Sequence, residues 1–188
     1  MTNYINRSEI KKKLEKKLST DQCDQAKGDF HAWREKCVTM LPIISGKDCP
    51  FGCTYCYIQS MGFQFKEPEP LKLSGEQICY ALLENKEFIA GRYGTPVAFG
   101  HISEPFLPQL LDNTLEYIKA ISTYLGNPIQ FSTKAAITPD LAKKIKSAIG
   151  GTGKSSTGGS AGGGHSIISP LVTITTLNHY KAGYLQPS

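Results

Sequence analysis

Short apolar runs alternate with helix-forming stretches, and this alternation limits the fold more than any other feature of the chain. The apolar runs predict strands at residues 38–45, 95–106, 127–135 and 169–179. The stretches between them have helical spacing and predict helices at residues 74–88, 107–122 and 138–148. Strands that alternate with helices pair in parallel, so the sequence predicts an α/β fold.

The number of strand–helix units limits the architecture further. A closed barrel of eight such units takes about 250 residues, whereas this chain has 188 residues and about four units. We therefore expect an open or partial (β/α) barrel of the TIM type. The last residues, 181–188, contain no further strand pattern, which leaves a truncated gene, a half-barrel and pairing with another chain as open alternatives.

Three local signals refine the predicted helices. Ser74 and Gln77 have the spacing of a capping box. Thr138 and Pro139 should begin the third helix. In the second helix, six residues share one predicted face: Leu110, Leu111, Thr114, Leu115, Ile118 and Ile121.

Two segments differ from the predicted core, which we place at residues 37–188. Residues 1–36 are polar and lysine-rich, and the spacing of Leu14 and Leu18 predicts a short amphipathic helix on a solvated, basic extension. Residues 150–164 hold eight of the 18 glycines and predict a flexible linker. Residues 148–155 match a loose phosphate-binding loop, but such a loop follows a strand and opens a helix, so we expect no nucleotide site there.

Composition and charge exclude several classes of protein. With 40% apolar residues the chain can bury a core, yet it has no apolar run of the roughly 18 residues that a membrane span needs. The N-terminus lacks the apolar segment of a secretion signal, so we expect a cytoplasmic protein with no membrane association. A net charge of +5 permits nucleic acid as a partner without indicating it.

Three of the six cysteines, Cys49, Cys53 and Cys56, follow the first predicted strand with the spacing C-x3-C-x2-C. Such crowding in a protein without a secretion signal favours metal or cluster ligation over disulfides. Three thiolates can hold an iron–sulfur cluster and leave one iron open. Asp48, Pro50, Gly52 and Thr54 surround the cysteines with a polar turn.

Two alternatives apply to the same cysteines. A structural zinc site needs four ligands, and the nearby His31 and Cys37 precede the strand rather than standing at the usual spacing. The second alternative is that the three are buried structural cysteines, which need apolar surroundings. This alternative suits Cys23, Cys37 and Cys79 better than Cys49, Cys53 and Cys56.

The string CPFGCTYC at residues 49–56, with the aromatic Tyr55 before its last cysteine, resembles the signature of radical S-adenosylmethionine (radical SAM) enzymes. In that family the three cysteines bind a 4Fe-4S cluster whose fourth iron binds S-adenosylmethionine. The resemblance implies that one electron, supplied by a reductant such as flavodoxin or ferredoxin, splits S-adenosylmethionine into methionine and a 5′-deoxyadenosyl radical. That radical abstracts hydrogen from a substrate. Tyr55 is then part of the cofactor site.

Polar residues follow the second predicted strand, at the end where barrels of this type place their sites. The string GHISEP, residues 100–105, stands where the family carries a Gly-Gly-Glu-like motif, which is absent here. The resemblance implies that Glu104 accepts a hydrogen bond from a bound amino group, with His101 and Ser103 beside it. The alternative is that Glu104, next to Pro105, only solvates a turn.

Polar residues also follow the third and fourth strands. Lys134, with the hydroxyls of Ser132 and Thr133, can hold a carboxylate through charge-assisted hydrogen bonds. The fourth predicted strand contains Thr173, Thr175 and Thr176, and we expect the pair that points inward, with Thr175, to reach the ribose. A β-branched strand without function would read the same.

The strings SEP and STK after successive strands resemble the spore photoproduct lyase branch of the family. This implies a lyase-like enzyme with DNA lesion repair as one activity, but the C-terminal half that contacts DNA in those enzymes has no counterpart here. The substrate therefore stays open. The alternative functions are a truncated iron–sulfur binding module without catalysis of its own and a zinc-binding interaction module.

Overall fold

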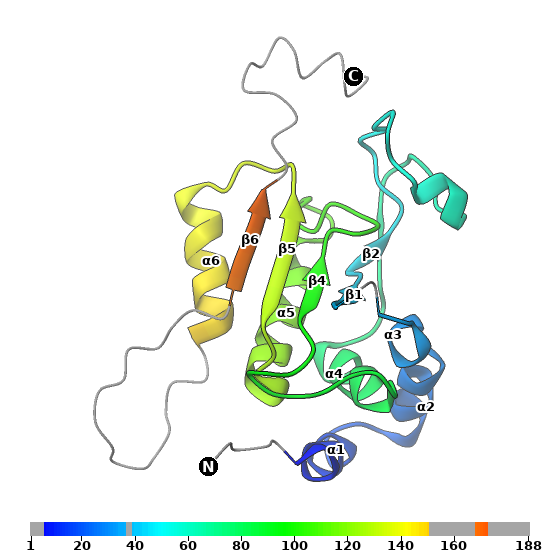
Figure 1. Ribbon diagram of the computed structural model, residues 1–188, viewed down its shortest axis with the longest axis vertical. Helices are drawn as coiled ribbons and strands as arrows, with labels where there is room; N and C mark the ends of the chain where they lie inside the picture. Colours follow the sequence, from blue (N-terminus) through cyan, green and yellow to red (C-terminus); the bar gives the residue numbers. More distant parts are fainter. Residues whose placement is uncertain (1–5, 37–38, 151–167, 173–188) are drawn as a thin grey trace.

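The computed structural model describes residues 6–36, 39–150 and 168–172, which form a mixed α/β fold (Figure 1). Its main sheet is parallel, has the strand order β1-β4-β5-β6, and contains β1 (Leu41–Ile43), β4 (Val97–Phe99), β5 (Ile129–Thr133) and β6 (Ile168–Val172). Each of these strands lies within, or within one residue of, a predicted apolar run. The prediction of a parallel α/β fold is therefore confirmed, and the described strands form an open sheet.

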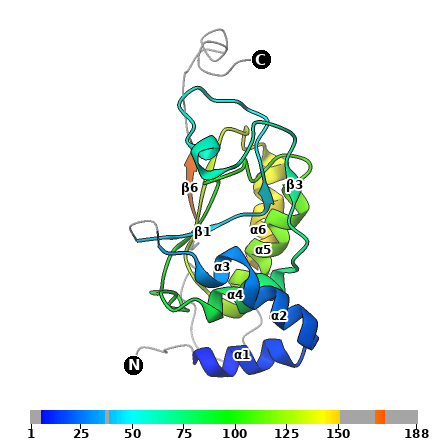
Figure 2. The ribbon, with the colours of Figure 1, turned by 90° about the vertical axis from the view of Figure 1, so that its right-hand side faces the viewer.

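Three helices connect these strands and lie to one side of them (Figure 2): α4 (Gly75–Glu84), α5 (Leu111–Ala120) and α6 (Pro139–Gly150). The predicted capping box is confirmed at α4. The Gln77 amide N–H donates to the Ser74 hydroxyl at 3.3 Å, and the Ser74 amide N–H donates to the Gln77 side chain at 3.0 Å. At α6 the Thr138 hydroxyl accepts from the amide of Leu141 at 3.2 Å. The cap residues therefore begin these helices where the sequence places them.

The hydrophobic core lies between the sheet and these helices. Leu41, Ile43, Val97 and Phe99 are at most 1% exposed and belong to this core. On the predicted face of the second helix, Leu110, Thr114, Ile118 and Ile121 are fully buried, and Leu111 and Leu115 pack against the core. Helix α5 ends in a π-helical turn, η2 (Ile121–Leu125).

The N-terminal residues form three helices that contact α4: α1 (Arg7–Glu15), α2 (Thr20–Gly28) and α3 (Phe30–Trp33). The predicted amphipathic helix is present as α1, but Ile10 and Leu14 are buried. Arg7 also donates from Nε to the carbonyl of Leu83 at 2.8 Å and from Nη2 to that of Asn85 at 3.0 Å, at the end of α4. The segment differs from the solvated extension that we predicted, because its apolar side packs on the core. The boundary at residue 36 stays a prediction.

A buried histidine closes the outer edge of β1. The backbone amide of Leu41 donates toward β4, to the carbonyl of Pro96, at 2.9 Å. Pro42 has no N–H, and the amide of Ile44 donates to Nε2 of His31 at 3.0 Å. His31 thus pairs an outward backbone N–H at this edge of the sheet from within the chain.

Several predictions fall outside the described residues. They include Cys37, Thr175 and all of the predicted linker 150–164 except Gly150, which ends α6. In the part of the chain that the structure describes, no helix has the length and apolar character to cross a membrane.

Candidate functional site

The loop that contains Cys49, Cys53 and Cys56, called the cysteine loop below, begins at Asp48. It follows directly after β2 (Gly46–Lys47), which pairs antiparallel with β3 (Glu69–Pro70). Asp48 has a φ of 68°, a left-handed conformation that aspartate tolerates better than most residues. Its carboxylate accepts from the amide of Gln64 at 2.7 Å and lies 3.3 Å from Nζ of Lys66. The amide of Cys49 donates to the carbonyl of Gln64 at 3.2 Å. These contacts hold the base of the loop in place.

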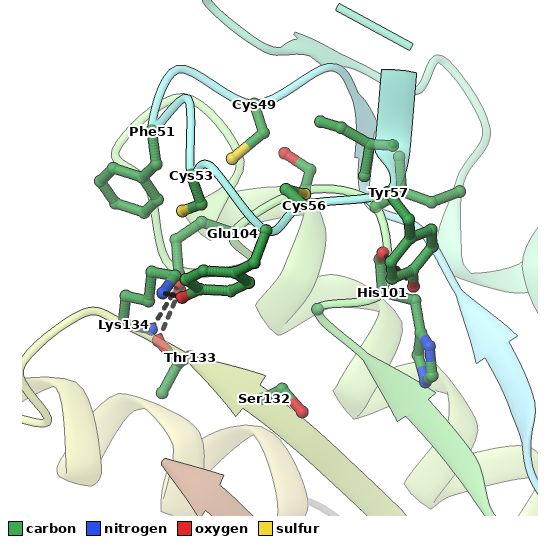
Figure 3. Close-up of a pocket in the computed structure, with 15 residues that line it drawn as sticks. Cys49, Phe51, Cys53, Cys56, Tyr57, His101, Glu104, Ser132, Thr133 and Lys134 are labelled. Carbon is green, nitrogen blue, oxygen red and sulfur yellow. Dashed lines mark hydrogen bonds between the residues drawn. The ribbon is translucent and has the colours of Figure 1, made fainter. Parts of the chain in front are cut away.

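Cys49, Cys53 and Cys56 all line one cavity of about 290 Å³ (Figure 3). Cys53 is buried, whereas the other two are partly exposed. Burial raises the pKa of Cys49, and the charges of Cys53 and Cys56 add to that effect. Hydrogen bonds from the backbone of Phe51 and Glu104 act in the opposite direction. The Cys49 thiol must therefore lose its proton when it binds a metal.

The fit of this loop to a metal group depends on the kind of group. No three His, Cys, Asp or Glu side chains among the described residues are arranged to hold a single metal ion. An iron–sulfur cluster has a different requirement, since each cysteine binds its own iron. Three thiols around one cavity, with backbone donors directed at Cys49, fit a cluster with three cysteine ligands.

The histidine considered as a zinc ligand has another role. His31 is fully buried, its Nδ1 lies 2.5 Å from Oδ1 of Asp29, and its Nε2 accepts from Ile44. Burial opposes ionisation of Asp29, but the hydrogen bonds from the ring and the backbone of His31 outweigh it and lower the pKa of that carboxyl. Both ring nitrogens of His31 are therefore used within the fold. The predicted burial of Cys23 and Cys79 is confirmed.

Glu104 connects the loop after β4 to the end of β5. It is 6% exposed, so the interpretation that it only solvates a turn is wrong. Its Oε1 accepts from the Thr133 hydroxyl at 2.5 Å and from the Phe106 amide at 3.2 Å, and its Oε2 accepts from the Lys134 amide at 2.7 Å. A carboxylate offers about four acceptor positions, which leaves room on Oε2 for one further donor.

Lys134 and Tyr55 meet across the cavity. The ammonium group donates to the Tyr55 hydroxyl and lies 5.0 Å from the centre of its ring. Burial lowers the pKa of Lys134, but the hydrogen bond to Tyr55 and the charge of Cys53 outweigh burial and raise it. Lys134 therefore carries a positive charge beside the cysteine loop at neutral pH.

The loop after β4 supplies a second group of polar side chains. Gly100 has a φ of 91°, and a Cβ there would stand 2.1 Å from the carbonyl oxygen of Ser132, so only glycine fits. His101 follows, and Tyr57 donates to its carbonyl at 2.8 Å. Burial, with the charge of Arg34, lowers the pKa of His101.

Ser103 differs from the other buried polar residues of the cavity. It is 7% exposed, and its hydroxyl has no hydrogen-bond partner among the residues that the structure describes. Leaving a buried hydroxyl unpaired costs about 1–3 kcal/mol. The described residues therefore leave the hydrogen bonding of this hydroxyl open.

The structure thus brings nine of the ten predicted site residues to one cavity: Cys49, Cys53, Cys56, Tyr55, His101, Ser103, Glu104, Ser132 and Lys134. Thr175 lies outside the described residues. Thr133 also lines the cavity, but its hydroxyl bonds to Glu104. Phe51 and Tyr57 also line the cavity but were not predicted, and their position beside the cysteines is the signal that would have found them.

Comparison with known proteins gave no match of any kind: no family model, no curated protein and no solved structure is similar to this chain.

Proposed function

We propose that this chain is the core of a radical SAM enzyme, with a 4Fe-4S cluster bound by Cys49, Cys53 and Cys56. The observation that carries the proposal is the shared cavity. It joins the three thiols to a lysine, a glutamate and an unpaired serine hydroxyl at the carboxyl ends of β4 and β5. In parallel β/α folds this end of the sheet is where catalytic residues gather. The four strands are then part of a partial (β/α) barrel.

Two side chains of this cavity match the charged end of S-adenosylmethionine. Lys134 supplies a positive charge for the carboxylate, and Oε2 of Glu104 retains an acceptor position for the ammonium group. A cluster held by Cys49, Cys53 and Cys56 would supply the electron, received from an external reductant, for reductive cleavage of S-adenosylmethionine to methionine and a 5′-deoxyadenosyl radical, and that radical would take a hydrogen atom from the substrate. The protein's contribution is to bind, orient and shield these groups. DNA lesions, as in spore photoproduct lyases, are one candidate substrate.

Electron paramagnetic resonance tests this proposal directly. After anaerobic reconstitution with iron and sulfide, we expect the reduced chain to give a 4Fe-4S signal that shifts when S-adenosylmethionine is added. Cys53→Ala should abolish the signal, because the cluster loses one of three ligands. Cys23→Ala is the matched control, since Cys23 is buried outside the cavity. A normal signal in Cys53→Ala would contradict the proposal.

The second candidate is an iron–sulfur binding module without catalysis of its own. The observation that favours it is the sheet, which has four strands in the described residues and is open. This candidate predicts a cluster signal that does not respond to S-adenosylmethionine, and formation of 5′-deoxyadenosine only after another polypeptide is added. Reductive cleavage by the isolated chain would exclude it.

A further inference from the structure

After the short helix η1 (Ile58–Met61), residues 62–71 return to the beginning of the cysteine loop, and we call them the return segment. Oδ1 of Asp48 accepts from the amide of Gln64 at 2.7 Å, and Oδ2 lies 3.3 Å from Nζ of Lys66. Both carboxylate oxygens of Asp48 therefore contact the return segment. A single side chain thus joins the start of the loop to the segment that follows its end.

The return segment is in turn fixed to the rest of the fold. Nδ2 of Asn113, on α5, donates to the carbonyl of Leu71 at 2.7 Å. Nε2 of Gln109, just before α5, donates to the carboxylate of Glu67 at 2.7 Å. The segment also pairs with β2 through β3. Asp48 therefore attaches the cysteine loop to a segment that α5 and the strand pair hold in place.

Asp48 and Lys66 differ in how far they are shielded from water. The Asp48 side chain is 11% exposed, whereas that of Lys66 is 47% exposed. An exposed partner contributes little to an ion pair, but a shielded carboxylate that accepts from a backbone amide forms one of the stronger hydrogen bonds in proteins. We therefore expect the bond from Gln64 to Asp48 to stabilise the loop more than the ion pair with Lys66.

We infer that Asp48 is a positioning residue for the cluster: its carboxylate holds the cysteine loop in the shape that brings Cys49, Cys53 and Cys56 to one cavity. Asp48 does not line that cavity itself, so it acts through the loop. Its contacts join protein groups only and do not depend on a metal. Because a loop shaped in advance loses less conformational entropy on binding, the cluster should bind more tightly and leave more slowly. The inference rests on the proposed function only for the identity of the bound group.

Alkylation of the full chain without metal tests the shape of the loop, with mass spectrometry to give a rate for each cysteine. Cys53 is 6% exposed and should react slowly in the wild type. Asp48→Gly allows the left-handed backbone but removes the carboxylate. We expect Cys53 to react about tenfold faster in this variant, as for the loss of one hydrogen bond to a charged group. Asp48→Asn retains an oxygen for the Gln64 amide and should restore the rate to within about twofold of the wild type.

Cys23 and Cys79 serve as internal references, because both are buried in the hydrophobic core and outside the cavity. Their alkylation rates should not change in Asp48→Gly. An equal increase at Cys23, Cys53 and Cys79 would show that Asp48 stabilises the whole fold, and an unchanged rate at Cys53 would show that it does not hold the loop. Either result would overturn the inference.

Lys66→Met is a second variant, chosen because Lys66 is exposed and its replacement should leave the fold intact. It should raise the alkylation rate of Cys53 about twofold. The matched control is Lys143→Met, which removes an exposed ion pair with Asp140 on α6 and should leave that rate unchanged. Equal rates at Cys53 in the two variants would contradict the inference.

The reconstituted chain tests the link to the cluster. Iron loss to a chelator such as EDTA should be about tenfold faster in Asp48→Gly than in the wild type or in Asp48→Asn. Equal rates, with a normal cluster signal in the wild type, would overturn the inference and leave the proposed function intact. A wild type that binds no cluster would instead reject the proposed function, and the alkylation rates would still decide whether Asp48 shapes the loop.

Discussion

Two regions of the molecule differ in whether their buried polar groups have hydrogen-bond partners. At the edge of β1, both ring nitrogens of His31 have partners in the protein. Beyond the carboxyl end of β4, the hydroxyl of Ser103 has no partner within the described part of the chain. Because a buried polar group without a partner costs stability, the histidine at the edge of β1 stabilises the fold, whereas the Ser103 hydroxyl does not.

The largest expected effect is that of replacing the histidine at the sheet edge. His31→Leu leaves the buried amide of Ile44 without a partner and removes the ring nitrogen from the Asp29 carboxylate, which keeps its hydrogen bond to the backbone amide of residue 31. We therefore expect the free energy of unfolding to fall by about 3 kcal/mol. The same substitution at His101, which is partly exposed, should cost less than about 1 kcal/mol. Urea denaturation of the two variants measures the difference, and equal losses would contradict the comparison.

A smaller difference in stability is expected between substitutions at two buried hydroxyl residues, Thr114 and Ser103. Thr114 is fully buried, donates to the carbonyl of Pro105 at 2.6 Å, and lies 2.7 Å from the Ser45 hydroxyl. Thr114→Val should therefore lower the free energy of unfolding by about 1–2 kcal/mol. Ser103→Ala removes a hydroxyl that has no partner and should change it by less than about 0.5 kcal/mol. A large loss in Ser103→Ala would show that Ser103 has a structural role.

The smallest expected effect is a pH dependence at His101. Its pKa is below the usual value of 6.5 in the folded chain, so the unfolded chain takes up a proton first as the pH falls. Stability should decrease with acidification below about pH 6.5. Thermal melts of the wild type and of His101→Leu, taken between pH 7 and pH 5, measure this term as the difference in slope. Parallel slopes would show that His101 makes no contribution.

Much of the fold could be predicted from local patterns. The capping box at Ser74 and the apolar face of α5 involve residues three or four apart, and both were confirmed. The packing of α1–α3 was not predicted, because it depends on contacts between distant residues, such as Arg7 with Leu83. The pairing of β2 with β3 escaped prediction for the same reason, since two-residue strands have no readable period.

In the candidate site, too, local patterns could be predicted from the sequence, whereas contacts between distant residues could not. The cysteine spacing, GHISEP and STK identified residues that the structure places around one cavity. The partners of those residues were not readable: Thr133 bonds to Glu104 rather than facing a ligand, and Tyr55 meets Lys134 from 79 residues away. Spacing identifies donors and acceptors, but it does not say which of them satisfy one another.

The sequence by itself determined the order of strands and helices, the helix caps and the group of three cysteines, because these depend on residue type and on neighbours along the chain. Only the tertiary structure decided which polar groups are satisfied by the protein. His31 became part of the sheet edge, Glu104 joined β4 to β5, and Ser103 was left without a partner. The physical reason is that hydrogen bonding in a buried site depends on which groups the fold brings within about 3 Å.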